Sequence, residues 1–360
     1  MSSQRSPQTP PEFFDLMLAY KNSALLKAGV ELGVFELLAQ GPSTAATVAQ
    51  KLTIAERGAR LLLNALAALG LLSSDGSSYQ LTSSAAKYLV PGQPGYLGDM
   101  AHVMVSRWEW EAFGTLPDAV RHGGPVVSEH AETPRYGFWE HMAAFSGAVG
   151  RPVAEVTAAH LQPWAANRDR LNILDVGCGH GIFGFTLAAQ HAHARVWSLD
   201  WPNVLDQTQK HAERFGLSDR STMVPGDMFE APLDGPYDVV LIANVMHHFS
   251  ADRGTALLER LAGAMAPDGR IVLAGFLTHD GPPEQDTAAH LFSVLMLVWT
   301  HAGEVHSQET YLQMLRTAGF GSARVQPVPG LPLSIIVAER ESADDNSWRA
   351  TNRIAGGVPA

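Results

Sequence analysis

Three acidic residues follow successive apolar runs in the second half of the chain. Asp175 stands at the start of a glycine loop, Asp200 closes the next apolar run, and Asp227 follows the run after that. If these runs are parallel strands, their carboxyl ends meet at one edge of a sheet and the three carboxylates converge there. Such a row suits a ligand with a ribose diol, an exocyclic amine and a positively charged appendage. S-adenosylmethionine has these groups, so we expect it to be the cofactor.

The glycine loop that begins at Asp175 lets the backbone turn sharply and lets a ligand lie against it without a Cβ in the way. Residues 179–184 also spell GxGxxG, a pattern that suits a dinucleotide, so an NAD-dependent oxidoreductase is one alternative. A carboxylate at Asp175 opposes a pyrophosphate but suits a cation, which favours S-adenosylmethionine. Met228 and Phe229, directly after Asp227, are large apolar side chains that can pack an adenine.

The second half alternates short apolar runs with segments long enough for helices, which predicts an α/β fold with a mostly parallel, Rossmann-like sheet and an antiparallel C-terminal edge. The expected strands cover residues 171–176, 194–199, 221–224, 237–243, 269–275 and 334–338. We place this cofactor-binding domain at residues 161–340. A helical, aromatic-rich linker and pocket region precedes it at 96–160, and a tail that we expect to be flexible follows at 341–360.

Residues 1–95 have the order helix, helix, helix, hairpin. Apolar residues recur at helical spacing over 11–40, where we expect a break near Gly29 and Gly33, and the hairpin turns at Asp75-Gly76. This order is that of a winged helix, so a transcription factor with a ligand-sensing α/β domain is a second alternative. The segment carries 7 Lys or Arg against 6 Asp or Glu, however, whereas a DNA reader needs a basic face. We therefore expect a homodimerisation domain that binds no nucleic acid.

The composition of the 360 residues disfavours several classes of protein. The net charge is −11 and 46% of the residues are hydrophobic, which is typical of a globular protein without a polyanion-binding surface. The one cysteine, Cys178, permits no internal disulfide, which fits a reducing compartment. The longest strongly apolar run, 291–299, is too short to cross a bilayer, and the first ten residues lack the apolar segment of a secretory signal. We expect a cytoplasmic protein with no membrane partner.

Residues 171–280 resemble a class I S-adenosylmethionine-dependent methyltransferase in the glycine loop, in the acid of the second strand and in the Gly-Asp-Met-Phe motif 226–229. With the N-terminal segment included, the resemblance narrows to the dimeric small-molecule O-methyltransferases of the caffeic acid type, and it covers residues 12–340. It implies a homodimer and a small-molecule substrate.

The resemblance also implies roles for individual residues in binding S-adenosylmethionine. Asp200 would hold the ribose, Asp227 and Met228 the adenine, and Gly177 and Gly179 the methionine part. The expected cofactor set is completed by Asp175, Trp201, Phe229 and Asn244. One contact departs from the pattern, because Ala243 and Asn244 stand where the family has a lysine at the end of the fourth strand.

The histidine pair that follows the fourth expected strand is the candidate catalytic site. In the resembled family this place reads His-Asp, and the histidine is the general base that deprotonates a phenol. His247 matches that base, whereas His248 replaces the acid that would orient it, so both are candidate catalytic residues. The family's assisting glutamate falls on Val305, and Glu304 is adjacent.

Two further histidines, His301 and His306, lie in a segment that lines the substrate pocket opposite His247 in this architecture. Imidazoles that converge on a cavity can bind a divalent or ferric transition-metal ion, and we predict His247 and His301 as its ligands. The metal would chelate an α-keto acid and stabilise its enolate for methyl transfer. This resembles a metal-dependent α-keto acid C-methyltransferase branch of the same fold.

C-methylation of an α-keto acid at its β-carbon is thus our first expectation. The alternative is metal-free O-methylation of a phenolic or hydroxyl compound by His247. A fold recruited for a reaction other than methylation also stays open, because the His-Asp pair is replaced. The candidate walls of the substrate pocket are large apolar side chains, namely Met142, Phe145, Met296 and Trp299.

Overall fold

The computed structural model describes residues 9–145 and 147–340, which form two compact units. One unit ends at Glu111 and the other begins at Ala112, so the region 96–160 that we expected as a linker is divided between them. The predicted domain bounds stay predictions, and the tail 341–360 lies outside the described residues. Among the described helices, none has both the length and the apolar character that a membrane span requires.

The first unit consists of helices and one hairpin. Its helices are α1 (Pro10–Glu31), α2 (Val34–Leu38), α3 (Ala45–Leu52), α4 (Glu56–Ala68), α5 (Ser83–Tyr88) and α6 (Asp99–Met104), and α7 (Arg107–Gly114) follows. The strands β1 (Leu72–Ser74) and β2 (Tyr79–Leu81) pair antiparallel on either side of Asp75-Gly76. The carboxylate of Asp75 accepts hydrogen bonds from the N–H groups of Ser77 (2.9 Å) and Ser78 (2.8 Å). The hairpin is confirmed, whereas the winged-helix assignment stays a prediction.

The break between α1 and α2 lies at Gly33 and not at Gly29. Gly33 has φ +72°, in the left-handed region that glycine adopts without strain. Gly29 lies inside α1, where an added Cβ would come within 2.8 Å of the ring of Phe35 and 3.3 Å of Leu66. The predicted break at Gly29 is therefore wrong, because this glycine allows α1 to pack closely against α2 and α4.

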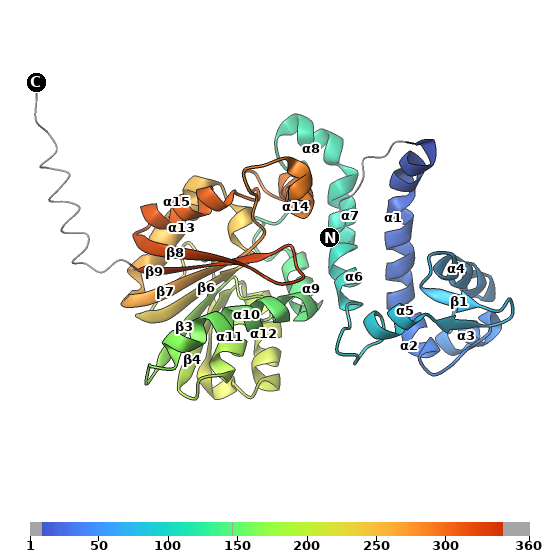
Figure 1. Ribbon diagram of the computed structural model, residues 1–360, viewed down its shortest axis with the longest axis horizontal. Coiled ribbons are helices and arrows are strands. Elements are labelled where there is room, and N and C mark those ends of the chain that lie inside the picture. The colour runs from blue at the N-terminus through green and yellow to red at the C-terminus, as the bar shows by residue number, and fades with distance from the viewer. Residues whose placement is uncertain (1–8, 146, 341–360) are drawn as a thin grey trace, which may run out of the picture. The chain divides into compact units, whose positions relative to one another are not determined.

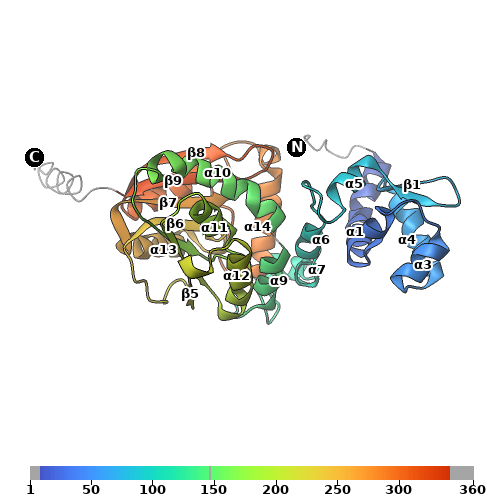
Figure 2. The ribbon, with the colours of Figure 1, turned by 90° about the horizontal axis from the view of Figure 1, so that it is seen from below.

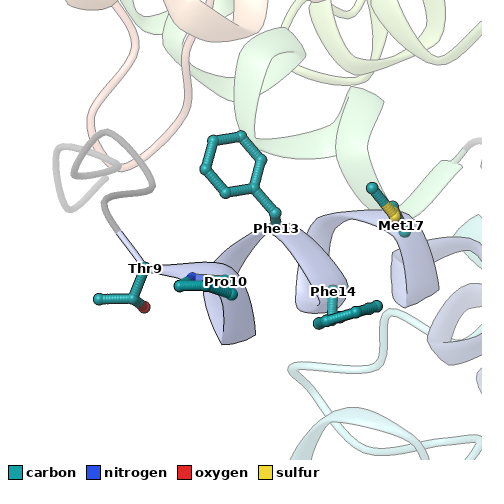
Figure 3. A pocket seen from close by; sticks show the side chains of 5 residues that line it. All are labelled: Thr9, Pro10, Phe13, Phe14 and Met17. Carbon is teal, nitrogen blue, oxygen red and sulfur yellow. The ribbon is translucent and has the colours of Figure 1, made fainter.

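Helix α1 carries apolar side chains that are largely exposed to solvent. Phe14, Leu16 and Met17 are 61%, 67% and 65% exposed. Figure 3 shows the side chains that line a hollow at the N-terminal end of this helix, namely Thr9, Pro10, Phe13, Phe14 and Met17. A contiguous apolar surface of this kind is typical of a protein–protein contact.

The second unit is a seven-stranded mixed sheet with helices on both faces (Figure 1). The strands run in the order β5-β4-β3-β6-β7-β9-β8, with the first five parallel and β9 antiparallel to both of its neighbours. Their bounds are β3 (Leu171–Val176), β4 (Ala194–Asp200), β5 (Ser221–Pro225), β6 (Tyr237–Ala243), β7 (Met265–Gly275), β8 (Phe320–Pro327) and β9 (Ser334–Arg340). The α/β fold with an antiparallel edge is confirmed.

Strand β8 is the one element of this sheet that the sequence analysis did not anticipate. It lies at the edge of the sheet and pairs only with β9. Its sequence, Phe-Gly-Ser-Ala-Arg-Val-Gln-Pro, is rich in small and polar residues. An edge strand packs one face on the core and pairs on one side, so it needs no continuous apolar run.

Helices cover the two faces of the sheet, and the sheet separates two apolar cores (Figures 1 and 2). Successive side chains of a strand point to opposite faces, so Ile173 of β3 belongs to one core and Leu174 to the other. The first core also includes Phe185 of α11 (Ile182–Ala189), and α10 (Gly147–Ala165) packs on the same helix. The second core includes residues of α13 (Ala251–Gly263) and α15 (Gln308–Thr317).

The sheet topology locates the ligand crevice. β3 has β4 on one side and β6 on the other, so the strand order reverses at the carboxyl ends of β3 and β6. In open α/β sheets ligands bind at such a switch point. The remaining helices of this unit are α8 (Leu116–His122), α9 (Gly137–Phe145), α12 (Pro202–Arg214) and α14 (Thr287–Trp299). Of these, α9 contacts α12, and α14 contacts α8 and the short turn after β6.

Candidate active site

The glycine loop between β3 and α11 has no room for a side chain at Gly177. Gly177 and Gly179 have φ +61° and +55°, where residues with a Cβ are strained. A Cβ on Gly177 would lie 2.6 Å from Val245 Cγ2 and 3.5 Å from Met228 Cε. The loop therefore lies close to the ends of β5 and β6, and the contacts of Gly177, Gly179 and Met228 with the cofactor stay predictions.

Asp200 ties the end of β4 to the glycine loop. One carboxylate oxygen accepts a hydrogen bond from the N–H of Gly179 (2.8 Å), and the other accepts from the N–H of Trp201 (2.7 Å). Trp201 is the residue that precedes the first turn of α12. The carboxylate thus lies at the crevice, beside the loop.

Asp175 lies beneath the loop and is only 1% exposed. Its carboxylate accepts a hydrogen bond from the N–H of Gly184 (2.9 Å) in the first turn of α11. Burial raises the pKa of Asp175 to about 7, and the negative charge of Asp200 adds to the shift. Burial also raises the pKa of Asp200 to about 6.

The negative charges of Asp175 and Asp200 repel each other, so a cation bound beside them would be favourable. S-adenosylmethionine carries a sulfonium and an ammonium, and the narrow glycine loop leaves its backbone free to contact the methionine part. The charges and the backbone of this region therefore fit this group, and its contacts with Asp175, Asp200, Gly177 and Gly179 stay predictions. When bound, it supplies an electrophilic methyl group.

The turn after β5 carries the residues expected to hold the adenine. The carboxylate of Asp227 accepts from the N–H of Phe229 (2.9 Å) and so closes the turn. The ring of Phe229 packs edge-to-face on Phe249 (5.0 Å between ring centroids), and the guanidinium of Arg253 lies 4.5 Å from the centre of the Phe229 ring. Contacts of Asp227 and Phe229 with adenine stay predictions.

The histidine pair lies on a tight turn at the carboxyl end of β6. Asn244 adopts φ +56°, and its N–H donates to the carbonyl of Ala274 (2.7 Å), which redirects the chain into the 3-10 turn Met246–His248. Asn244 Oδ1 and His247 Nδ1 lie 3.7 and 3.8 Å from the point where a Cβ of Gly275 would stand. The strained turn therefore brings both side chains to the end of β7.

Both imidazoles are enclosed by aromatic rings. His247 is 2% exposed, and its ring packs edge-to-face on Phe292 (4.7 Å) and lies 4.6 Å from the ring of His248. Trp139 packs edge-to-face on His248 (5.1 Å). Burial holds the pKa of His247 well below its ordinary value and lowers that of His248 to about 4, so both rings are neutral near pH 7.

The tautomer of His248 follows from its hydrogen bond. Its Nδ1 lies 3.0 Å from the carbonyl oxygen of Val245, which can only accept, so Nδ1 carries the proton and Nε2 has a free lone pair. His306, by contrast, donates from Nε2 to the carbonyl of Phe249 (2.9 Å) and so anchors the end of the same turn.

The carboxylate that acts on His248 comes from a segment that the sequence analysis did not consider. Val305, at the position of the family's glutamate, is buried, while the side chain of Glu304 is exposed. The negative charge of Glu132 offsets part of the burial effect on the pKa of His248. Glu132 also contacts Nδ1 of His301, so one carboxylate faces two histidines.

His301 lies with His130 and Glu132. One ligand atom from each of the three lies within 4.8 Å of the others. Among the described residues, this is the group in which at least three potential metal ligands lie close together, and it does not include His247. The predicted pair of His247 and His301 as metal ligands stays a prediction.

The predicted pocket residues differ in their surroundings. Met296 and Trp299 are fully or almost fully buried, and Trp299 belongs to a cluster of edge-to-face and tilted rings with Tyr136, Phe138 and Trp139. Met142 has its Cε 3.8 Å from the point where a Cβ of Gly179 would stand. The ring of Phe145 lies 4.9 Å from that of His141. Their roles as pocket walls stay predictions.

Trp139 belongs to the aromatic segment that the sequence offered as a pocket wall, whereas His130 and Glu132 were not predicted, because they lie on a loop far from the histidine pair along the chain. The signal that could have found these two residues is the polar run Ser-Glu-His-Ala-Glu-Thr-Pro at 128–134. It has two acids and a histidine beside the predicted aromatic segment.

Comparison with known families decides the identity of the chain. A model of the O-methyltransferase domain matches residues 145–321, and a model of the O-methyltransferase dimerisation domain matches residues 14–91. The chain is 31% identical over 324 residues to 3-hydroxy-5-methyl-1-naphthoate 3-O-methyltransferase of Streptomyces sahachiroi, covering 88% of this chain and 90% of the relative. The chain belongs to the O-methyltransferase family. It is an S-adenosylmethionine-dependent methyltransferase of small molecules.

Solved structures of similar proteins agree with this assignment. A Nostoc punctiforme protein assigned as an O-methyltransferase superposes with a TM-score of 0.83 at 30% identity, covering 93% of this chain and all of that one. Human N-acetylserotonin methyltransferase in complex with S-adenosylmethionine gives 0.79 at 25% identity, covering 95% of this chain and all of that one. The cofactor prediction is confirmed, and the oxidoreductase and transcription-factor alternatives are set aside.

The relatives also bear on the atom that is methylated. Besides the naphthoate enzyme, the chain is 26% identical over 335 residues to L-tyrosine C(3)-methyltransferase of Streptomyces lavendulae, covering 88% of each. These names describe transfer to an aromatic hydroxyl and to an aromatic ring carbon. They support the O-methylation alternative better than α-keto acid C-methylation, which they do not support.

Proposed function

We propose that this methyltransferase transfers a methyl group to the hydroxyl oxygen of a small aromatic compound, with His247 as the general base. The observation that carries the proposal is a buried imidazole pair at the carboxyl end of β6. It stands beside the cofactor crevice and is enclosed by Phe292 and Trp139. The aromatic walls suit an aromatic acceptor, which packs edge-to-face on such rings.

The neutral imidazole supplies the base that a phenol needs. A phenolic hydroxyl has an ordinary pKa near 10 and loses its proton as its oxygen attacks the methyl group. His247 accepts that proton, and the burial that lowers its pKa keeps the ring unprotonated before the reaction. His248, whose Nδ1 is held by the Val245 carbonyl, presents Nε2 as a fixed acceptor.

The carboxylate of Glu132 acts on His248 and not on the base His247 itself. Its negative charge favours the protonated form of His248. The rings of His247 and His248 pack against each other, which limits the movement of both. The aromatic cluster around Trp299 excludes water from this side of the site. Positioning of the hydroxyl in line with the methyl group is thus done by rigid rings.

The test compares acceptor classes. Purified enzyme with labelled S-adenosylmethionine is incubated with a panel of phenols, hydroxynaphthoates and α-keto acids, each with and without a chelator. We expect label transfer to phenolic oxygen that the chelator leaves intact. Transfer only to keto acids, lost on chelation, would instead establish the metal-dependent C-methylation that we first expected.

We also propose that the enzyme is a cytoplasmic homodimer that pairs through its N-terminal unit. The match to a dimerisation domain over residues 14–91 supports this, and so do the exposed apolar side chains of α1. We propose no nucleic-acid or membrane partner, because residues 1–95 carry nearly equal numbers of basic and acidic side chains.

A further inference from the structure

A cluster of two histidines and one carboxylate lies beside the acceptor side of the site, and its side chains take no direct part in the proposed proton transfer to His247. His130 and Glu132 lie on the loop before α9, and His301 follows the last turn of α14. The rings of His130 and His301 meet edge-to-face with 4.9 Å between their centroids, and Glu132 contacts Nδ1 of His301. Three potential ligands thus converge from two segments that are far apart in the sequence.

The backbone holds these two segments together independently of the cluster. The N–H of Ala131 donates to the carbonyl of Trp299 (3.1 Å), and the indole N–H of Trp139 donates to the carbonyl of Ala131 (3.1 Å). At His130 the chain turns, because its N–H donates to Thr133 Oγ1 (3.1 Å) and its carbonyl accepts from the N–H of Thr133 (2.9 Å). The ligand-bearing residues are therefore placed before any ion binds.

The cluster is not complete as a hydrogen-bonded group. Nδ1 of His130 is buried and has no hydrogen-bond partner among residues 9–145 and 147–340. A buried polar atom that stays unpaired costs free energy, so a native structure usually gives it a partner. His301 and Glu132 already contact each other, which leaves the imidazole of His130 as the group that lacks one.

The chemistry of the three groups selects a class of ligand. Two neutral imidazoles and one carboxylate are the donors that first-row divalent ions prefer, and the single negative charge offsets part of the charge of the ion. Zinc bound tetrahedrally by imidazole nitrogen at about 2.0–2.1 Å brings its ligand atoms to within about 3.3–3.4 Å of each other. The ligand atoms of the cluster lie within 4.8 Å of one another, and the imidazole of His301 is 66% exposed, so it can move inward to close the difference.

We propose that His130, Glu132 and His301 form a binding site for a divalent first-row transition-metal ion, of which Zn²⁺ is the probe, and that the ion fastens the loop before α9 to the end of α14. The site differs from the pair of His247 and His301 that the sequence suggested. It also does not depend on which atom the enzyme methylates, since neither S-adenosylmethionine nor the acceptor enters it.

The experiment measures metal uptake by the full chain without a tag. Zn²⁺ is titrated calorimetrically into the wild type, and Co²⁺ absorption reports the ligand field. We expect one Zn²⁺ per chain at this site, a higher melting temperature with the ion, and at least a tenfold weaker affinity in His130→Ala and in Glu132→Gln. His279→Ala is the matched control, because the side chain of His279 is 56% exposed and its Nδ1 pairs with the carboxylate of Asp286, away from the three proposed ligands.

Uptake at wild-type affinity in either His130→Ala or Glu132→Gln overturns the proposal, and so does the absence of uptake by the wild type. Far-ultraviolet circular dichroism and S-adenosylmethionine binding by each variant show that the fold is retained. Because no acceptor is present, failure here leaves the proposed O-methylation standing, and failure of the acceptor panel leaves the metal site standing.

Discussion

The cofactor side and the acceptor side of the site are assembled in different ways. On the cofactor side, Asp175 and Asp200 are tied to the glycine loop by hydrogen bonds to backbone N–H groups at the ends of neighbouring strands. On the acceptor side, His248, Glu132 and Trp139 come from separate segments and meet through ring packing and charge. The first side is set by local strand ends, and the second depends on how distant loops fold over the sheet.

This difference indicates which substitutions should affect turnover and which should affect cofactor binding. A change on the acceptor side should alter turnover and leave cofactor binding intact, because its side chains do not support the glycine loop. A change in the loop should alter cofactor affinity first. The following predictions test whether the two sides can be altered independently of each other.

The largest effect is expected for His247→Ala. Loss of the general base should lower kcat by about 10²–10⁴-fold, because the phenol then lacks the imidazole that takes its proton. Affinity for S-adenosylmethionine, measured by calorimetry, should stay within about twofold of the wild type, a change of less than 1 kcal/mol. His290→Ala removes an exposed histidine on α14 and should leave both quantities unchanged. Full activity in His247→Ala would refute the role of this residue.

The next effect is expected for Gly177→Ala. A Cβ there is strained by φ +61° and would lie 2.6 Å from Val245, so S-adenosylmethionine should bind about 10- to 100-fold more weakly. Gly216→Ala is the matched control. It has φ +66° with open space around the position, so it should cost stability on unfolding but not cofactor affinity. Equal losses of affinity in both variants would mean that backbone strain alone is responsible.

A smaller effect is expected from pH. The pKa values of Asp175 and Asp200 are raised to about 7 and about 6, so the carboxyl groups take up protons as the pH falls through these values. A cation attracts only the ionised form. Affinity for S-adenosylmethionine should therefore rise about tenfold between about pH 5.5 and pH 7.5. S-adenosylhomocysteine lacks the sulfonium charge, so its affinity should depend less steeply on pH. Identical pH profiles of affinity for the two ligands would contradict the attraction of the sulfonium to these carboxylates.

The smallest change in a measured quantity is expected in the first unit. Phe14→Asp combined with Met17→Asp places two charges on the exposed apolar face of α1, which should halve the mass measured by light scattering. Leu291→Asp is the matched control, because Leu291 is 63% exposed on α14 and should leave the mass unchanged. A doubly substituted chain that remains a dimer would place the interface elsewhere.

Much of the cofactor side could be predicted from the sequence alone. The strands β3 and β6 have the bounds expected from their apolar runs, and the acids at the strand ends follow from parallel strand order. The break at Gly29 was wrong and β8 was missed for related reasons. A glycine inside a helix and a polar edge strand both owe their structure to neighbours that no local pattern shows.

The arrangement of the acceptor side depends on the tertiary structure. Sequence alone determined the α/β class, the glycine loop and the carboxylates of Asp175 and Asp200, because strand periodicity and backbone turns are local properties of the chain. The placement of Glu132 against His248, and of His130 against His301, depends on a loop that lies more than a hundred residues away along the chain. Its position is set by burial of aromatic rings and by hydrogen bonds such as Ala131 to Trp299, which short-range patterns do not encode.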